Sequence, residues 1–388
     1  MYEAQASKEA DFLKKAFGEY YKAHTIDSVS GVEFREFGFG LFKKKIANRN
    51  LAFENSAQMN SFLKSSAPLF FSYSNAYYKF PSRTPMQSKE LLKADIIYEF
   101  DADELGLEVP QINGIQWFAL EHLEEAKKQV FRLLDYIEND FNFSSEGLSI
   151  NFSGKAGFHV HLRGKEIQDL KKKARIELVD YLTAQNIDYL NIGFDFDSLR
   201  APRPLGLWQK RLLNGIKVFF EKNDKEIAKI TGVTKKKINS LTQNKSAIIN
   251  SLDKGVLMQI EAHKSDDFWK KILDNVVAKE RIPIDRQTSI DLHKIIRVPQ
   301  TLHGDTGFIA KVLLIDELKK FNPYNDAIVF DETFAKKFNL EKVSVQVIAC
   351  PRFELLGQIF GPFENSLEEL PLFAAVYLIG KGAAVLKE

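Results

Sequence analysis

The sequence is almost free of cysteine, and this limits the kinds of site that it can contain. Only Cys350 is a cysteine among the 388 residues. An intrachain disulfide is therefore impossible, and a cysteine-based zinc or iron–sulfur centre within this chain is excluded. Because such sparing use of cysteine is typical of a reducing compartment, we expect a cytoplasmic, intracellular protein.

Long apolar runs and a strong charge of one sign are also missing. The longest apolar stretch near the C-terminus, 373–379, is far shorter than the ~20 residues that span a bilayer. The N-terminal segment is charged and lacks the pattern of a signal peptide, so we expect no membrane role. The net charge is only +2, so any nucleic-acid surface must be a local patch.

Strands and helices alternate irregularly along the chain. This pattern predicts an α/β protein of the α+β type with a mixed β-sheet, because the regular rhythm of a doubly wound parallel sheet is missing. Residues 207–280 lose the strand pattern and become helical and rich in lysine. We therefore expect a core formed by 1–206 and 281–388, and a helical subdomain or insertion over 207–280.

Two aspartates at the end of an apolar strand carry the clearest chemical signal. Because strand side chains alternate, Ile96, Tyr98 and Phe100 are predicted to face the core. Asp101 and Asp103 then share the other face, roughly 7 Å apart. Two such carboxylates repel, and hard divalent cations would offset the repulsion, as in a two-metal phosphoryl- or nucleotidyl-transfer site. A lone Asp-x-Asp is more often a solvated acidic turn.

A glycine-rich hairpin forms a second group of polar residues. Strands are predicted over 148–153 and 158–162, joined by the tetrapeptide 154–157. Alternation places Ser153 and His159 on the same polar face beside the turn. Exposed N–H groups, a hydroxyl, a lysine and an imidazole suit a triphosphate. A plain surface hairpin is an equally good interpretation of this segment alone.

A third segment adds charged side chains. Asp285 could complete a metal-binding triad, and Arg297 and His303 could contact phosphates. By itself, this segment is better interpreted as a loop beside a strand, with Asp285 as a helix cap.

Taken together, the three segments resemble the catalytic small subunit of archaeal and eukaryotic DNA primase. The family's three motifs are matched, in chain order, by Asp101 and Asp103; by Ser153, Gly154, Lys155, Gly157, Phe158 and His159; and by Asp285, Arg297 and His303. Residues 35–39, 75–78, 93–95 and 372–378 are similar to other parts of the family. The resemblance therefore extends over nearly the whole chain.

This resemblance implies a primase catalytic core and a role for each residue. Two Mg²⁺ or Mn²⁺ ions would be held by Asp101, Asp103 and Asp285. Nucleotide-binding residues would be Ser153, Lys155, His159, Arg297 and His303, with Arg35, Glu36 and Arg49 on the side of the initiating nucleotide or its sugar. The reaction would be template-directed synthesis of short RNA primers from NTPs on single-stranded DNA, by a DNA-directed RNA polymerase of the primase type acting at the replication fork.

The family also implies a separate large subunit, because its iron–sulfur domain cannot lie on this cysteine-poor chain. Many relatives carry a zinc knuckle that ends in Trp-x-Cys-x-x-Cys after the first motif. Here Ala119 and His122 take the cysteine positions, so we expect no structural zinc. Apolar packing through Trp117 and Phe118 is expected to replace the metal. The family usually has a second basic residue in the hairpin, at the position of Ala156. One phosphate contact is therefore either lost or made by Lys155 alone.

Two other functions fit the same residues. A primase–polymerase of this superfamily that uses dNTPs in repair would have identical chemistry, and the sequence leaves the choice of sugar open. A catalytically silent structural subunit of a replication complex is disfavoured, because it would have no reason to keep a repulsive acidic cluster.

Two weaker patterns lie beyond the three motifs. Asp195 and Asp197 form a second Asp-x-Asp, which lacks a glycine hairpin after it and is interpreted as a charged turn. Residues 226–238 have the pattern of a helix-turn-helix, with Gly232 at the turn. A small helical subdomain without a DNA-reading role produces such a pattern more often, and Lys235 to Lys237 are more often a solvated face.

Overall fold

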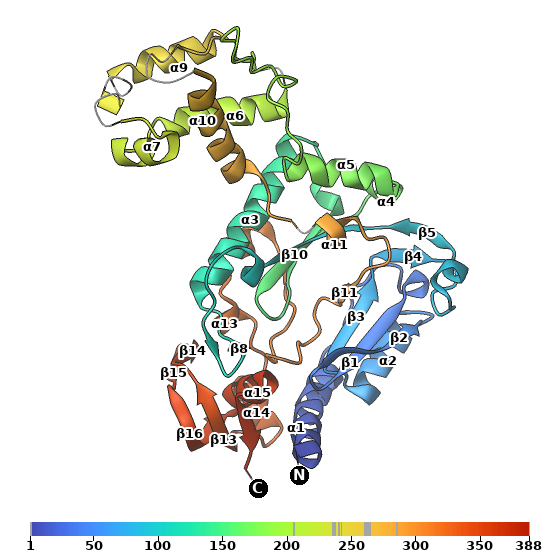
Figure 1. The fold of residues 1–388 in the computed structure, drawn as a ribbon. Helices are drawn as coiled ribbons and strands as arrows, with labels where there is room; N and C mark the ends of the chain where they lie inside the picture. The colour runs from blue at the N-terminus through green and yellow to red at the C-terminus, as the bar shows by residue number, and fades with distance from the viewer. Residues whose placement is uncertain are drawn as a thin grey trace. The chain divides into compact units, whose positions relative to one another are not determined.

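The computed structural model describes residues 2–204, 206–234, 238–239, 241, 243–259, 265–284 and 286–387. The chain forms two compact units (Figure 1). The first comprises Met1–Leu134, Asn142–Ile176 and Ile284–Glu388, and the second comprises Asp135–Phe141 and Glu177–Pro283. The helical segment expected over 207–280 lies inside the second unit. Helices and antiparallel strand pairs are both abundant, so the predicted α+β class is confirmed.

The described helices are the following: α1 (Tyr2–Ala23), α2 (Ser56–Ser66), α3 (Leu120–Asn139), α4 (Lys165–Gln168), α5 (Lys172–Leu182), α6 (Leu207–Phe219), α7 (Asp224–Thr231), α9 (Lys245–Asp253), α10 (Ser265–Glu280), α11 (Arg286–Ile290), α12 (Ile315–Lys320), α13 (Pro323–Asp326), α14 (Glu332–Lys337) and α15 (Leu372–Lys381). Short 3₁₀ turns occur at η1 (Val32–Phe34), η2 (Met86–Lys89), η3 (Ala102–Glu104) and η4 (Ser145–Gly147). None of the helices described has the length and apolar character needed to cross a membrane.

Two four-stranded antiparallel sheets lie at the centre of the first unit. One has the order β11-β3-β1-β2 and contains β1 (Phe37–Leu41), β2 (Lys44–Leu51), β3 (Phe70–Ser74) and β11 (Ile295–Arg297). The other has the order β12-β9-β10-β6 and contains β6 (Ile96–Asp101), β9 (Leu148–Phe152), β10 (Gly157–Leu162) and β12 (Val312–Leu313). Late strands therefore join early ones, since β11 pairs with β3 (Figure 1). In the same way, β12 pairs with β9.

Alternating side chains explain how the second of these sheets presents a polar face. On β10, Phe158 and Val160 point away from the side that carries His159 and His161. The Phe158 ring packs against Phe152, with ring centroids 5.8 Å apart. Burial of an aromatic side chain of this kind stabilises the fold by about 2–3 kcal/mol. The apolar face thus anchors the sheet and leaves the histidine face available for chemistry.

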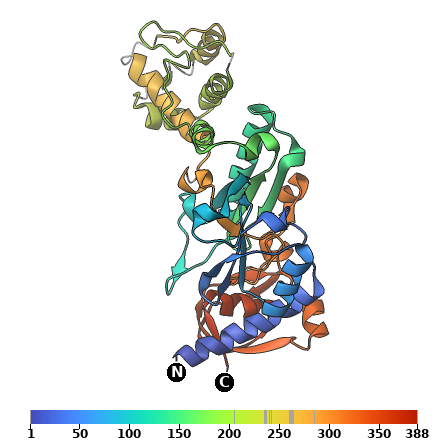
Figure 2. The same cartoon turned by 90° about the vertical axis from the view of Figure 1, so that its right-hand side faces the viewer.

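The C-terminal part of the first unit forms a third sheet, of order β16-β13-β17. Its strands are β13 (Lys342–Cys350), β16 (Phe363–Pro371) and β17 (Ala384–Leu386). α15 is buried from Leu372 to Gly380. α1 lies beside this sheet (Figure 2), where the Leu386 N–H donates to Glu9 Oε1 at 3.0 Å. Two-stranded pairs complete the unit: β4 (Ala76–Tyr78) with β5 (Leu91–Ala94), β7 (Gln111–Ile112) with β8 (Ile115–Gln116), and β14 (Phe353–Leu355) with β15 (Gln358–Phe360).

The second unit is built around α10, which packs against α6 and α7. Its apolar residues Trp269, Ile272 and Leu273 are buried. The spacing of three to four residues places them on one helical face.

Candidate active site

A cavity of about 250 Å³ is lined by both central sheets. Strands β2, β3 and β11 supply one part of its wall, and β6, β10 and the turn between β9 and β10 supply another. The lining residues are Lys45, Ile46, Ser72, Glu99, Asp101, Asp103, Phe118, Ser153, Lys155, Ala156, His159, Ile295, Ile296, Arg297 and His303.

Seven of the eleven site residues predicted from the sequence meet in this cavity. They are Asp101, Asp103, Ser153, Lys155, His159, Arg297 and His303. Asp285, the predicted third carboxylate, lies outside the described residues. The helix that follows it in the chain, α11, lies against β6.

The two aspartates reach the cavity from different elements, and the prediction that both lie on the strand was wrong. β6 ends at Asp101, and Asp103 lies in the 3₁₀ turn η3. The reason lies in the neighbouring strand β10, whose first residue, Gly157, pairs with Asp101. The residues after Asp101 therefore have no residue of β10 to pair with. The Ala102 N–H instead donates to Ala156 O at 3.0 Å and turns the chain.

Burial, together with the charges of Glu99, Asp103 and Glu104, raises the pKa of Asp101 to about 6. Carboxylates that disfavour one another's ionisation form a hard oxygen donor set suited to a divalent cation. Within the described parts of the chain, no three His, Cys, Asp or Glu side chains are close enough to hold a metal ion. The described residues therefore fit part of a metal site, and a further ligand is needed.

The hairpin turn is held by the Ser153 side chain. Ser153 Oγ accepts hydrogen bonds from the N–H groups of Gly157 at 3.1 Å and Lys155 at 3.4 Å. Gly154 has a φ of +86°, which favours glycine, and a Cβ there would come within 2.9 Å of His303 Cβ. This turn is therefore fixed closely against the segment that carries His303.

His159 is held as a neutral imidazole. Its Nδ1 lies 3.4 Å from Asn151 Nδ2, which can only donate, so the ring proton is on Nε2. That nitrogen lies 3.6 Å from Glu99 Oε1. Burial lowers the pKa of His159 to about 4, although the Glu99 charge acts in the opposite direction. His159 thus orders the cavity wall as a hydrogen-bonding group rather than as a cation.

Arg297 and His303 form a region that can bind anions. Arg297 is buried, donates to Leu302 O at 3.1 Å and lies 5.3 Å from the centroid of the Phe70 ring. Burial lowers the pKa of Arg297 to about 10, so it stays charged at neutral pH. His303 Nδ1 accepts the Asp305 N–H at 3.1 Å, so its Nε2 carries a proton that can be donated. Burial and the Arg297 charge hold the pKa of His303 well below its ordinary value.

A profile of the DNA primase small subunit family matches residues 100–314, a stretch that includes the aspartate pair and the hairpin. This chain belongs to the DNA primase small subunit family. The primase small subunit of Methanothrix thermoacetophila is 30% identical over 97% of this chain and 99% of its own length. That of Methanosarcina barkeri is 29% identical over 97% of this chain and 97% of its own length. That of Methanocaldococcus jannaschii is also 29% identical, over 95% of this chain and 95% of its own length. The resemblance noted from the motifs is thus confirmed.

Three residues predicted for this primase site lie elsewhere. Arg35 is 0% exposed and donates to Asp95 Oδ2 at 2.7 Å and to the carbonyls of Ser74 and Asn75. This enclosure gives Arg35 a clear structural role, and its predicted contact with a nucleotide stays a prediction. Glu36 is likewise buried, where it pairs with Arg49 at 2.8 Å and Lys89 at 3.1 Å.

Sequence reasoning missed Glu99 and Lys294. Glu99 pairs with Lys294 and, like Asp101, lines the cavity. Its position two residues before Asp101 was a usable signal, because residues i and i+2 of a strand share a face. Lys294 gave no such signal, because it is 195 residues from Glu99 in the chain and meets it only in the folded protein.

The segment from Trp117 to His122, in which we expect no structural zinc, is held by aromatic and backbone contacts. The Trp117 ring lies 5.9 Å from Phe353 and 6.1 Å from Tyr377. His122 Nδ1 accepts the Ala119 N–H at 3.0 Å, and its Nε2 lies 3.0 Å from Glu108 O. Both ring nitrogens of His122 are therefore engaged with the backbone, and the ring contacts of Trp117 agree with the expected apolar packing. The absence of zinc stays a prediction.

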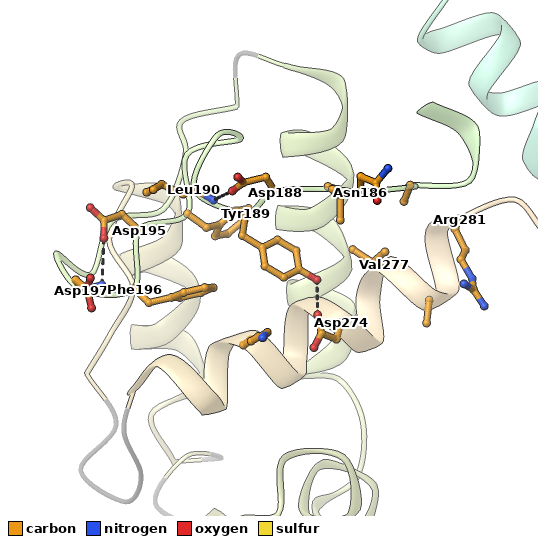
Figure 3. Close-up of a pocket in the computed structure, with 15 residues that line it drawn as sticks. Asn186, Asp188, Tyr189, Leu190, Asp195, Phe196, Asp197, Asp274, Val277 and Arg281 are labelled. Carbon is orange, nitrogen blue, oxygen red and sulfur yellow. Dashed lines mark hydrogen bonds between the residues drawn. The ribbon is translucent and has the colours of Figure 1, made fainter. Parts of the chain in front are cut away.

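A larger cavity, of about 1020 Å³, lies in the second unit and is lined by the other Asp-x-Asp pair (Figure 3). There Asp195 Oδ1 accepts the N–H groups of Asp197 and Ser198, both at 3.1 Å. The Tyr189 hydroxyl donates to Asp274 at 2.6 Å. Asp195 thus closes a local turn, which agrees with its interpretation from the sequence.

Proposed function

We propose that this chain is the catalytic subunit of a DNA primase and makes short RNA primers on single-stranded DNA by template-directed nucleotidyl transfer. The observation that supports this best is a single cavity in which Asp101 and Asp103 lie with Arg297 and His303. An acidic cluster beside an anion-binding surface is what a reaction between a metal-activated hydroxyl and a nucleoside triphosphate requires.

The metal ions would be held by Asp101 and Asp103, and the family resemblance adds Asp285 as the third ligand. Two Mg²⁺ or Mn²⁺ ions bound there would activate the primer 3′-hydroxyl and stabilise the departing pyrophosphate. The Asp101 carboxyl, whose pKa is raised to about 6 by burial and by neighbouring carboxylates, gains a favourable partner when a cation binds.

The triphosphate would be bound by cations and N–H groups on the other side of the cavity. Arg297 and Lys155 supply positive charge, and His303 donates through Nε2. Because Ser153 Oγ already accepts two N–H groups, its hydroxyl proton is available for a phosphate oxygen. His159 and Glu99 order the wall between these groups and the aspartates.

Two macromolecular partners and one class of substrate belong to this proposal. The template is single-stranded DNA, and the NTPs enter the cavity described above. A separate large subunit is expected, since the curated relatives are named small subunits.

The test is primer synthesis on single-stranded DNA by the isolated chain, with and without a candidate large subunit. Replacement of the pair by amides, Asp101→Asn with Asp103→Asn, keeps the shape and removes the charge, so we expect synthesis to fall below detection. The matched control is Asp195→Asn with Asp197→Asn in the second unit, which should retain activity. Unchanged synthesis by the first variant would exclude the proposed site.

The same assay separates this function from that of a primase–polymerase. Parallel reactions supplied with NTPs or with dNTPs measure the choice of sugar directly. Preferential use of NTPs is the expected result. Extension with dNTPs alone would favour the repair-type enzyme, and no synthesis under any condition would favour a structural subunit.

A further inference from the structure

The helix-turn-helix pattern that the sequence shows over 226–238 stays a prediction. It includes Lys235, Lys236 and Lys237, which lie outside the described residues.

A row of buried polar side chains joins the two central sheets of the first unit. Its members are Tyr73 on β3, His161 on β10, Asn151 on β9 and His159 on β10, each at most 5% exposed. Each lies within hydrogen-bonding distance of the next, in that order. The row ends at the wall of the candidate active site, where His159 lies. Buried polar groups linked in this way hold one another in place, because it is unfavourable to leave any one of them unpaired.

Asn151 sets the direction of these hydrogen bonds. Its Nδ2 lies 2.9 Å from Phe152 O, which can only accept, so the amide nitrogen is on that side. The amide oxygen must then accept, and the His161 Nε2–H donates to it at 2.8 Å. The other hydrogen of Nδ2 is donated to His159 Nδ1 at 3.4 Å. Because burial lowers the pKa of both histidines, each ring is neutral and carries its one proton on Nε2.

The far end of the row begins at a cation that can only donate. Arg163 Nη2 donates to the Tyr73 hydroxyl at 3.3 Å. That hydroxyl lies 3.4 Å from His161 Nδ1, which has no proton, so Tyr73 donates to it. Each group therefore donates to the next, from Arg163 as far as His159. None of them can reverse its direction without leaving a buried neighbour unpaired.

The last proton of the row belongs to the cavity wall. His159 Nε2 lies 3.6 Å from Glu99 Oε1, which is longer than a hydrogen bond. Its N–H can therefore donate to an oxygen atom bound in the cavity. The other ring nitrogen is already engaged by Asn151. The row thus decides which nitrogen of His159 carries the proton on the cavity side.

We propose that Tyr73, His161 and Asn151 are positioning residues that hold the His159 ring as the tautomer with its proton on Nε2. His159 then contacts the nucleotide as a neutral hydrogen-bond donor. It can donate to an oxygen of the nucleotide, but it offers no lone pair with which to remove the proton of the primer 3′-hydroxyl. This proposal rests on the proposed function, because it concerns the nucleotide site described there.

Asn151→Asp keeps the shape of the side chain and replaces a donor by an acceptor. One carboxylate oxygen still accepts the His161 Nε2–H, but the other now faces His159 Nδ1, where it requires a proton. At pH 8 the ring is neutral, because burial holds its pKa at about 4. The His159 proton should therefore move from Nε2 to Nδ1.

The matched control is Asn60→Asp, which places the same charge at another buried asparagine of the first unit. The Asn60 amide donates to the carbonyls of Ile26 and Ser56 and accepts the Ile26 N–H. This change therefore buries a charge without altering the hydrogen bond between Asn151 and His159.

Two measurements on the full chain test the proposal. In protein labelled with ¹⁵N-histidine, NMR distinguishes ring nitrogens with and without a proton, and His159→Gln identifies the His159 signals among the seven histidines. Steady-state kinetics at pH 8 give the KM for NTPs and the kcat of primer synthesis. In Asn151→Asp we expect the Nδ1 tautomer and a KM raised about tenfold, with kcat changed less. Asn60→Asp should keep the Nε2 tautomer and a KM within about twofold of the unmodified chain.

Three results would overturn the proposal. They are a His159 ring that keeps its Nε2 proton in Asn151→Asp, a changed tautomer with an unchanged KM, and an equal rise of KM in Asn60→Asp. Circular dichroism checks that each variant is folded. If Asn151→Asp fails to fold, Asn151→Leu replaces it, because leucine has a similar volume and adds no charge. A proton should then appear on Nδ1 in part of the molecules, and its absence would contradict the proposal.

The NMR measurement needs no substrate, so it tests the positioning role even if the chain makes no primers. A failure of primer synthesis in the unmodified chain would count against the proposed function alone. A His159 proton on Nδ1 in the unmodified chain would count against the positioning role alone.

Discussion

Gly157 lies directly opposite Asp101 in the ladder between β6 and β10. A Cβ on Gly157 would overlap Asp101 Oδ1 and lie only 3.0 Å from Asp101 Cα. The glycine hairpin and the acidic pair, which the sequence presents as separate motifs, are therefore one packed unit. Any displacement of the hairpin moves the carboxylate proposed to bind metal.

We predict that Gly157→Ala reduces primer synthesis at least tenfold, because the added methyl group pushes the Asp101 side chain out of place. Overpacking of this kind should also lower the free energy of unfolding by about 1–3 kcal/mol. Gly18→Ala is the control, since its Cβ would meet only Ala67 Cβ at 3.4 Å. Urea unfolding and a primer assay, run together, check both effects. Full activity of Gly157→Ala would show that this close contact is unimportant.

The raised pKa of Asp101 predicts how stability depends on pH. Burial and nearby carboxylates raise this pKa from its ordinary 3.8 to about 6, so the folded state holds the proton more tightly than the unfolded chain. The contribution of Asp101 to stability therefore falls as pH rises from about 4 to about 6, and stays low above that. In metal-free buffer, Asp101→Asn should be more stable than the unmodified chain at pH 7, by on the order of 1–3 kcal/mol.

Denaturant unfolding between pH 4 and pH 8 measures this difference. Burial lowers the pKa of His159 to about 4, so its contribution makes stability rise with pH, and it does so equally in both proteins. Subtracting one stability curve from the other therefore leaves the contribution of Asp101. The two curves should converge near pH 4. Added Mn²⁺ should stabilise the unmodified chain and leave Asp101→Asn unaffected. Parallel curves at all pH values would contradict the pKa assignment.

Arg297→Met should raise the KM for NTPs at least tenfold, because a buried charge that faces the cavity is lost. The variant should unfold at about the same denaturant concentration, since an apolar side chain of similar volume replaces a desolvated cation. Arg352→Met, at an exposed position, is the control. Steady-state kinetics with varied NTP check the prediction, which fails if KM is unchanged.

The buried pair Arg35–Asp95 predicts a large effect on stability. Both side chains are 0% exposed, so Arg35→Met leaves the Asp95 carboxylate without its closest cation and should lower the free energy of unfolding by about 3–5 kcal/mol. Arg49→Met removes a partly exposed partner of Glu36 and should cost less, about 1 kcal/mol. A normally stable Arg35→Met with impaired NTP binding would support the nucleotide-binding role predicted for Arg35.

Much of the fold could be predicted because alternation and helical spacing are local properties. The strands predicted at 148–153 and 158–162 appear as Leu148–Phe152 and Gly157–Leu162. The strand predicted to carry both aspartates was wrong at its end, because β6 stops at Asp101, where its partner strand β10 begins at Gly157.

By itself the sequence singled out the residues that are proposed to carry the chemistry: Asp101 and Asp103, the Ser153–His159 hairpin, and Arg297 with His303. Residue type and spacing are written in the chain, and they are enough to indicate the family. Only the tertiary structure decided that Arg35 is enclosed with Asp95, that Asp103 lies on a turn, and that Glu99 pairs with Lys294 beside Asp101. These facts depend on antiparallel pairing between strands far apart in the chain, and on the burial that pairing creates, neither of which is a property of any single segment.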